Sequence, residues 1–411
     1  MRSVVLPYIA GLASGLVLAA GTSAAIAGDV DGTYKKLRVF SQVLTYVQQN
    51  YVDELDGDEL VYDAITGMLS GLDPHTTFMR PAEYEKLRED TAGEFGGLGI
   101  EVGPYQENGR DIIQIEVVHA DSPGAHAGLK PADKITAVDG AGMGPDPLAT
   151  SVKLMRGVPG TRVVLTVERK GWEKPRDIPL VRRQVRVPSV DGDDLGNGVA
   201  YVRIRAFQER TDQELAHALA DARKRARDQG RSLPAGVVVD LRDNPGGLLD
   251  EGVRVADRFL DDGLIVTTQG RNPRNTEREV AHAEGTEPSY PVVLLVNEGT
   301  ASASEIVAGA LQDHKRAVVV GTRTFGKGSV QTLFGLDDGA GLKLTIARYF
   351  TPSGRSIQDV GIEPDVPVRP GPDVPPGLQG VERVKQDPQI AAAVDVIAHW
   401  PPGKNLARGV R

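Results

Sequence analysis

The segment around Ser302 constrains the fold more than any other. The apolar, β-branched run Val292–Val296 is followed at residues 297–305 by NEGTASASE. This pattern predicts a buried strand, a sharp turn and then a helix. A serine at such a turn lies at a helix N-terminus, where backbone N–H groups lack intrahelical partners and can stabilise a developing oxyanion. Ser302 is therefore a candidate nucleophile.

A second segment supplies a candidate base. The run at 318–320 (VVV) is followed at residues 321–331 by GTRTFGKGSVQ. If residues 327–331 are extended, Lys327, Ser329 and Gln331 project on one face. A lysine of ordinary pKa, about 10.4, is almost wholly charged at neutral pH, so burial must lower that pKa before Lys327 can act as a base. Gln331 can orient the amine without adding a charge, which makes a serine, amine and amide set suited to hydrolysis.

Each segment also allows a simpler interpretation. Ser302 and Glu305 have the spacing of a helix capping box. Residues 321–327 resemble a phosphate-binding loop, but Gly328 occupies the position of the magnesium-binding Ser or Thr, and the β-patterned SVQTLF follows where a helix is required. Lys327 could equally be a solvated lysine in a glycine-rich turn. None of these interpretations explains why both segments occur in one chain.

Three blocks together carry a resemblance to a known family. The blocks DLRDNPGG (240–247), TASASE (300–305) and FGKGSVQ (325–331) resemble the signatures of the C-terminal processing peptidases, or tail-specific proteases. The similarity covers roughly residues 34–367. Thr300 replaces the first serine of the family's serine run, and Pro245 stands where many members carry glycine. The resemblance implies a ClpP/crotonase-like core with Ser302 as nucleophile, Lys327 as base and Gln331 as its partner.

The oxyanion donors are expected on both sides of Ser302. The Ala303 N–H is adjacent to the nucleophile, and the N–H of Gly246 or Gly247 can approach closely because glycine has no side chain. Four charged residues are expected to form supporting ion pairs: Asp240, Arg242, Glu305 and Asp313. His314 lies about three helical turns beyond Ser302, too far to serve as its base.

Residues 195–368 are predicted to form the peptidase core, of mixed α/β class. Apolar runs at 199–204, 237–239 and 265–268 alternate with helical patterns, which favours a parallel sheet with its chemistry beyond the carboxyl ends of the strands. Thr211 and Glu214 have capping-box spacing before a helix that runs to Gln229. The polar, proline-containing stretch 271–291 is expected to be a loop.

Residues 95–184 are predicted to form an inserted PDZ domain. The GLGI sequence at 97–100 resembles the carboxylate-binding loop of that domain, in which the N–H groups of Leu98, Gly99 and Ile100 would hold a free C-terminus. SPGAHAGL (122–129), DKI (133–135) and VDG (138–140) follow in PDZ order and spacing. A helix over about 147–155 would flank the peptide groove.

The ends of the chain and its composition limit the compartment and the chemistry. Residues 1–28 form an uncharged stretch after Arg2 and end in an A-x-A-like cleavage signal, which predicts a signal peptide or an inner-membrane anchor and hence an exported, periplasmic or cell-envelope protein. Residues 34–92 are predicted to be helical, in a region that in the resembled family supports assembly or partner binding, and residues 369–411 to form a C-terminal extension. Acidic residues outnumber basic ones, 56 to 47, which argues against nucleic acid as a partner. The chain has no cysteine and its seven histidines lack metal-site spacing, so neither a metal nor a cofactor is expected.

The sequence thus predicts an exported serine endopeptidase that captures protein C-termini, free and apolar, through its PDZ domain. An adaptor protein and a homo-oligomer are compatible with it. The alternative is a catalytically inactive PDZ scaffold that binds protein tails or a partner protease. A crotonase-like acyl-CoA enzyme would share the core but gives no reason for a PDZ domain or an export signal.

Overall fold

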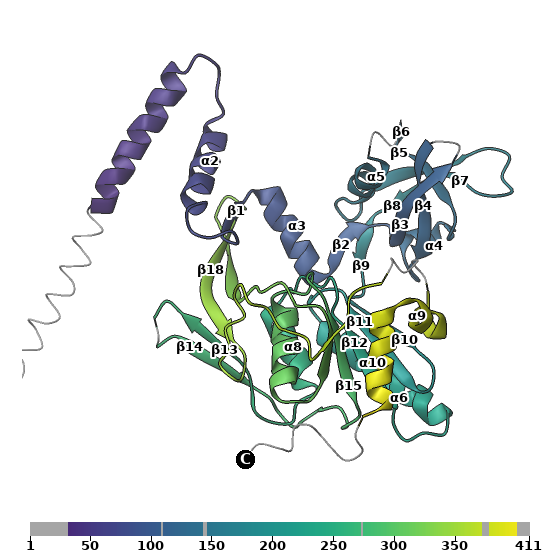
Figure 1. Cartoon of the computed structure of the whole chain (residues 1–411). Coiled ribbons are helices and arrows are strands. Elements are labelled where there is room, and N and C mark those ends of the chain that lie inside the picture. The colour runs from purple at the N-terminus through teal and green to yellow at the C-terminus, as the bar shows by residue number, and fades with distance from the viewer. Residues whose placement is uncertain (1–31, 108–109, 143–145, 273, 372–377, 401–411) are drawn as a thin grey trace, which may run out of the picture. The chain divides into compact units, whose positions relative to one another are not determined.

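The computed structural model describes residues 32–107, 110–142, 146–272, 274–371 and 378–400 (Figure 1). The chain divides into two compact units, Met1–Phe78 and Met79–Arg411. The predicted targeting segment 1–28 lies outside the described residues. No helix in the described ranges has both the length and the apolar character needed to cross a membrane.

The first unit is helical, as predicted for residues 34 onward. The chain is helical over 32–50 and again in α2, Gly57–Leu69. The Asp56 carboxylate accepts a hydrogen bond from the Asp58 N–H and caps α2. Apolar residues along the first helix are largely exposed, Leu37 by 54% and Val43 by 55%.

The second unit begins with a β-rich module in the region predicted to be a PDZ domain. After α3 (Pro81–Ala92), its sheet has the order β3-β4-β5-β7-β8, with β6 beside β5, and a separate pair joins β2 to β9. Its core contains buried Ile113, Ile135 and Leu165. The elements are β2 Glu94–Gly97, β3 Ile100–Glu107, β4 Arg110–Val118, α4 Pro123–His126, β5 Lys134–Val138, β6 Ala141–Gly142, α5 Pro147–Met155, β7 Arg162–Glu168, β8 Arg176–Val181 and β9 Arg183–Arg186.

The largest core is built on a six-stranded sheet of order β10-β11-β12-β15-β16-β19, parallel except for the edge strand β10. The three central strands are continuous apolar runs because both of their faces are covered. Side chains alternate: Val237 and Val239 face a cluster with the helices α6, α7 and α8, whereas Val238 faces α10. The elements are β10 Val190–Asp194, β11 Val199–Ile204, α6 Thr211–Asp228, β12 Gly236–Asp240, α7 Leu249–Asp257, β15 Val292–Val296, α8 Ala303–Asp313, β16 Val318–Gly321, β19 Val366–Pro367, α9 Gly380–Gln386 and α10 Pro388–Ala398.

A second, antiparallel sheet joins β14, β13, β18 and β17 in that order. These strands are β13 Leu264–Gly270, β14 Thr276–Val280, β17 Ser329–Gly335 and β18 Gly341–Phe350. The prediction of a loop over 271–291 is wrong in part, since β14 lies within it. All five residues of β14 are exposed, so the strand depends on backbone pairing with β13 and carries no apolar alternation in its sequence.

The predicted capping box at α6 is also wrong. The residue that caps the helix is Arg210, with φ 74°, and the Thr211 hydroxyl accepts from the Gln208 N–H outside the helix. The Glu214 carboxylate accepts instead from the N–H and hydroxyl of Ser189. Both side chains therefore anchor the chain before β10 and the loop before α6, which a local spacing rule cannot anticipate.

Candidate active site

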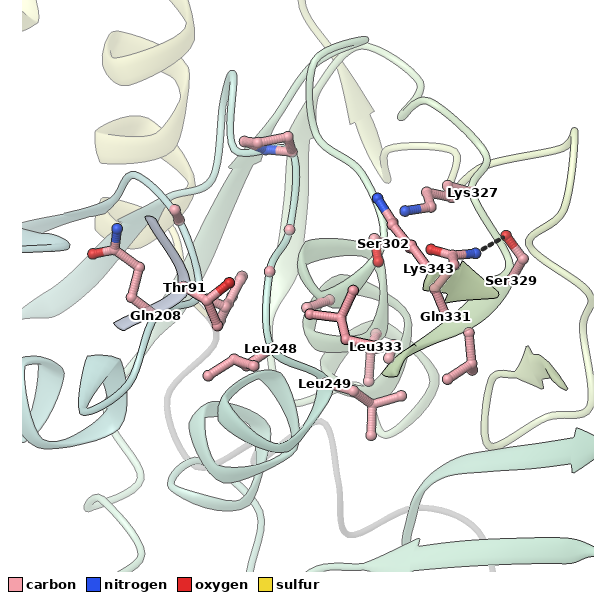
Figure 2. A pocket seen from close by; sticks show the side chains of 18 of the residues that line it. Thr91, Gln208, Leu248, Leu249, Ser302, Lys327, Ser329, Gln331, Leu333 and Lys343 are labelled. Carbon is pink, nitrogen blue, oxygen red and sulfur yellow. Dashed lines mark hydrogen bonds between the residues drawn. The ribbon is translucent and has the colours of Figure 1, made fainter. Parts of the chain in front are cut away.

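The two sequence segments and the glycine-rich turn meet at one edge of the parallel sheet. The strands β12, β15 and β16 are neighbours, and their carboxyl ends lead to residues 240–247, to Ser302 and to the Lys327 loop. A cavity of about 420 Å³ opens there, lined among others by Ser302, Lys327 and Gln331 (Figure 2). Ala303, Gly246 and Gly247 also line it.

Ser302 occupies a strained turn at the start of α8. Its backbone angles are φ 57° and ψ −118°, a conformation that residues with a side chain rarely adopt. Hydrogen bonds fix this turn on both sides: the Ala301 N–H donates to the Asn244 carbonyl oxygen at 3.0 Å, and the Glu305 N–H to that of Ser302 at 2.8 Å. The turn points the Ser302 side chain into the cavity, away from the helix it precedes (Figure 2).

Glu305 connects this turn to the lysine loop. Its carboxylate is fully buried and accepts four hydrogen bonds. Two come from the N–H groups of Ser302 and Lys327, at 2.8 and 2.9 Å. The others come from the Thr324 hydroxyl at 2.6 Å and the Gly326 N–H at 2.7 Å. The expectation of an ion pair at Glu305 is wrong because neutral donors from the lysine loop surround it.

Burial raises the pKa of Glu305, and these four donors oppose that change by favouring the ionised form. The Glu305 carboxylate therefore acts as a hub that connects the Ser302 turn to the Lys327 loop. The Glu305 side chain also reaches the Ser302 N–H, as the capping-box interpretation predicts.

The environment of Lys327 favours a neutral amine. Burial lowers its pKa, the positive charge of Lys343 lowers it further, and the negative charge of Glu305 acts in the opposite direction. Among the described residues, the Lys327 amine has no hydrogen-bond or ion-pair partner. The Ser302 and Lys327 side chains thus share the cavity without a direct hydrogen bond, as is common in active sites without substrate.

Tyr349, on β18, also contacts both residues. Its hydroxyl donates to the Lys327 carbonyl oxygen and interacts with the Ser302 side chain, and burial raises the pKa of this tyrosine. No sequence pattern marks Tyr349, because an aromatic residue in an alternating strand is typical of any packed sheet.

Gln331 lies on β17 and shares a face with Ser329, as expected for extended backbone, although a bulge falls between Val330 and Gln331. Its amide nitrogen donates to the Ser329 hydroxyl at 2.9 Å and to the Thr345 hydroxyl at 3.3 Å. The amide oxygen is directed toward the lysine side of the cavity (Figure 2). It forms no hydrogen bond with Lys327 in the part of the chain that is described.

The three candidate oxyanion donors differ in whether their N–H group already forms a hydrogen bond. The Gly246 N–H donates to the Asn244 side chain at 2.9 Å, so it is already engaged. The N–H groups of Ala303 and Gly247 have no acceptor within the described ranges. A side chain on Gly246 would lie 2.7 Å from the Ser302 Cβ, which explains the glycine there. The geometry thus favours Ala303 and Gly247 as the pair of donors.

The remaining charged candidates form ion pairs that connect the elements around the cavity. Asp240 pairs with Arg242 at 2.6 Å, and Arg242 also pairs with Asp387 at 2.8 Å, which ties the turn after β12 to the start of α10. Asp313 pairs with Arg355 at 2.5 Å. The His314 ring bonds to the carbonyl oxygen of Leu264, away from the cavity. The described residues contain no cluster of acidic or histidine side chains that could hold a metal ion.

The predicted peptide-binding loop joins β2 to β3. The N–H groups of Leu98 and Gly99 have no acceptor in the portion of the chain that is described, whereas their carbonyl oxygens accept from Gly124 and His119. Gly99 has φ 67°, and a Cβ there would lie 2.2 Å from that of Ser122. Ile100 opens β3, an edge strand of its sheet that contacts α5, so a free strand edge lies beside a helix, as peptide addition requires.

Comparisons with known proteins agree with this geometry. The model of peptidase family S41 matches residues 198–368, and that of the PDZ domain matches residues 114–169. The chain is 41% identical over 361 residues to a carboxy-terminal-processing protease of Bartonella bacilliformis, covering 88% of this chain and 81% of that protein. It is 39% identical over 325 residues to a carboxyl-terminal-processing protease of Synechocystis, covering 78% and 74%. Among solved structures, a putative S41 protease from Bacteroides fragilis aligns with a TM-score of 0.53 at 16% identity, over 87% of this chain and 97% of the other, which supports the mixed α/β fold with a PDZ domain.

Proposed function

Because the chain belongs to the carboxy-terminal-processing proteases of peptidase family S41 and is a serine-type peptidase, we propose that Ser302 and Lys327 form its catalytic dyad. The observation that carries this proposal is the Glu305 hub. One buried carboxylate holds the backbone N–H groups of both residues, at 2.8 and 2.9 Å, so that their side chains enter the same cavity.

In the proposed reaction, Lys327 takes the proton of the Ser302 hydroxyl while the Ser302 oxygen attacks the carbonyl carbon of the scissile bond. The N–H groups of Ala303 and Gly247 donate to the oxyanion of the tetrahedral intermediate. The Lys327 ammonium then gives its proton to the leaving amine, and an acyl-enzyme remains on Ser302. The same amine activates the water that releases the second product.

We propose that substrate capture completes the dyad. In the structure, the Lys327 amine is not bonded to Ser302, while Tyr349 interacts with the Ser302 hydroxyl. A rotation of the flexible lysine side chain would bring the amine to Ser302 in place of that contact. The amide oxygen of Gln331, whose nitrogen is already engaged by Ser329, is suited to hold the lysine in its new position.

The PDZ domain is proposed to select the substrate by its free C-terminus. The unengaged N–H groups of Leu98 and Gly99 would bind the terminal carboxylate, together with that of Ile100, and the tail would add to β3. Charge-assisted hydrogen bonds of this kind contribute about 1.5–3 kcal/mol each. Amidation of the tail should therefore weaken capture by an order of magnitude or more, since about 1.4 kcal/mol is tenfold.

The test uses two protein substrates with the same apolar tail, one with a free C-terminus and one amidated. Ser302→Ala and Lys327→Ala are each expected to abolish cleavage while the fold is retained, and the exposed Lys224→Ala on α6 serves as the matched control. Near-normal cleavage by Lys327→Ala would refute the proposed dyad. Equal cleavage of the two substrates by the unaltered enzyme would refute recognition of the free C-terminus, but it would not affect the assignment as a peptidase.

The proposed compartment rests on residues 1–28. We propose export, with the segment either cleaved or retained as an anchor in the inner membrane. Cell fractionation, together with N-terminal sequencing of the purified protein, decides between the two. Recovery of an intact chain from the cytoplasm would refute export.

A further inference from the structure

A second lysine, Lys343, lines the same cavity. It lies on β18 opposite Leu333 of β17, and both side chains border the cavity. Lys343 is half-buried, and it forms no hydrogen bond or ion pair with any residue in the described ranges. Figure 2 shows its amine directed toward that of Lys327, above Ser302, and the charges of the two lysines interact.

No counter-charge is paired with Lys343 in the described ranges. A half-buried ammonium group in this position can bind the carboxylate of a ligand without first breaking an ion pair. The only acidic residue among the described residues that line the cavity is Asp90, which comes from α3 rather than from the β17–β18 edge. Of the other lining side chains, Leu333, directly opposite Lys343, is apolar, as are Leu249 and Val330 elsewhere in the cavity.

We propose that Lys343 is a specificity-determining residue, whose ammonium group binds a carboxylate that the substrate carries next to its scissile bond. The inference rests on the proposed function of Ser302 and Lys327. An acidic side chain flanking the scissile bond is one source of the carboxylate. The other is the terminal carboxylate of a substrate cut within a few residues of its end.

A carboxylate bound at Lys343 affects substrate binding and the base in opposite ways. A bound carboxylate pairs with Lys343 and strengthens substrate binding, but its negative charge also favours the ammonium form of Lys327, which opposes catalysis at low pH. The preference for a carboxylate is therefore expected in KM rather than in kcat. A residue with a purely structural role would alter both parameters equally for charged and neutral substrates.

The experiment compares matched peptides in the full chain. One set carries Glu, Gln or Lys at each of three positions on either side of the scissile bond. A second set ends one to three residues after that bond, as free acid or amide. The enzymes are the unaltered chain, Lys343→Met, Lys343→Arg and Lys343→Glu, with Lys224→Met as the surface control. For each enzyme, kcat/KM for the carboxylate-bearing peptide is divided by kcat/KM for its neutral counterpart. A general loss of activity in a variant lowers both values and therefore leaves this ratio unchanged.

The unaltered enzyme and Lys224→Met are expected to prefer the carboxylate-bearing peptide by about tenfold at one position. Lys343→Arg should keep this preference, Lys343→Met should reduce the ratio to about one, and Lys343→Glu should instead favour the Lys peptide. A preference confined to the first set identifies an acidic side chain, and one confined to the second identifies the terminal carboxylate. The proposal is overturned if the unaltered enzyme shows no preference, or if the preference survives in Lys343→Met and Lys343→Glu. Residual cleavage by Ser302→Ala would instead refute the proposed function.

Discussion

Removal of the Glu305 carboxylate should uncouple Ser302 from Lys327, the proposed nucleophile and base. In Glu305→Ala, the Thr324 hydroxyl and the N–H groups of Ser302, Gly326 and Lys327 all lose their acceptor. The two catalytic segments are then joined mainly by the backbone bond from Phe325 to Thr300. We expect both the stability of the core and the alignment of the dyad to fall.

The expected loss in free energy of unfolding follows from the number of hydrogen-bond donors left unpaired in Glu305→Ala. Each buried donor without an acceptor costs about 1–3 kcal/mol. Water that enters the vacated space can pair with some of the four donors, and loss of a buried charge removes a cost that is visible in the raised pKa of Glu305. A net loss of about 3 kcal/mol is therefore expected, which lowers the melting temperature by about 6–12 °C for a domain of this size. A misplacement of 1 Å in such a site lowers the rate about a hundredfold.

Glu305→Gln should be milder, because the amide keeps one acceptor oxygen. With that oxygen toward the Ser302 and Lys327 N–H groups, the NH2 group faces the Thr324 hydroxyl and the Gly326 N–H, which both lose their acceptor. Two donors rather than four are then left unpaired, at a cost of about 1–3 kcal/mol each. The expected order of stability and activity is Glu305, then Gln, then Ala.

The assay measures thermal unfolding and kcat/KM for each variant. Glu298→Ala is the matched control, because Glu298 also bridges the two segments, through the Thr322 hydroxyl at 3.1 Å, but is exposed. Its stability should change by less than about 0.5 kcal/mol. If Glu305→Ala matched Glu298→Ala in both measurements, the hub would not be what aligns the dyad.

Two further changes test the neighbouring assignments. Gln331→Glu places a carboxylate beside Lys327, which favours the ammonium form and raises the pKa of the base, so the acid limb of the kcat/KM profile should move to higher pH; an unmoved limb would show that this side chain does not face the amine. Gly99→Val should weaken binding of a free C-terminal peptide by tenfold or more in fluorescence anisotropy, because its Cβ would lie 2.2 Å from that of Ser122, whereas Gly128→Ala, with a positive φ but open space around its Cβ, should bind nearly as before.

The sequence predicted those parts of the molecule that short patterns determine. The mixed α/β class and the family are confirmed, since short β-branched apolar runs such as Val292–Val296 favour buried strands and the three signature blocks are specific. The structure places all six predicted catalytic and oxyanion residues on one cavity, and it adds that the Gly246 N–H is already engaged.

The missed features depend on contacts between distant segments. The Glu305 spacing is that of an ordinary capping box, and its function appears only when a loop 19–22 residues away supplies three more donors. Lys343 and Tyr349 lie in β18, where polar and apolar side chains would alternate in the same way whether or not the strand bordered an active site. The strand β14 has no buried residue, so no hydrophobic signal marks it.

The strain at Ser302 leads to a last prediction, on the balance between stability and activity. The backbone at Ser302, φ 57° and ψ −118°, is disfavoured for any residue with a Cβ but is open to glycine. Ser302→Gly and Ser302→Ala both remove the nucleophile, yet only glycine relieves the strain, which is of order 1–3 kcal/mol. Part of that gain is lost because glycine has more freedom in the unfolded chain, at about 0.5–1 kcal/mol. Ser302→Gly should therefore unfold at a temperature a few degrees above Ser302→Ala in calorimetry, with both inactive. Equal melting temperatures for the two variants would mean that the backbone at residue 302 is not strained and that the surrounding hydrogen bonds alone set its conformation. The position of the Ser302 side chain in the cavity would then cost the protein no stability.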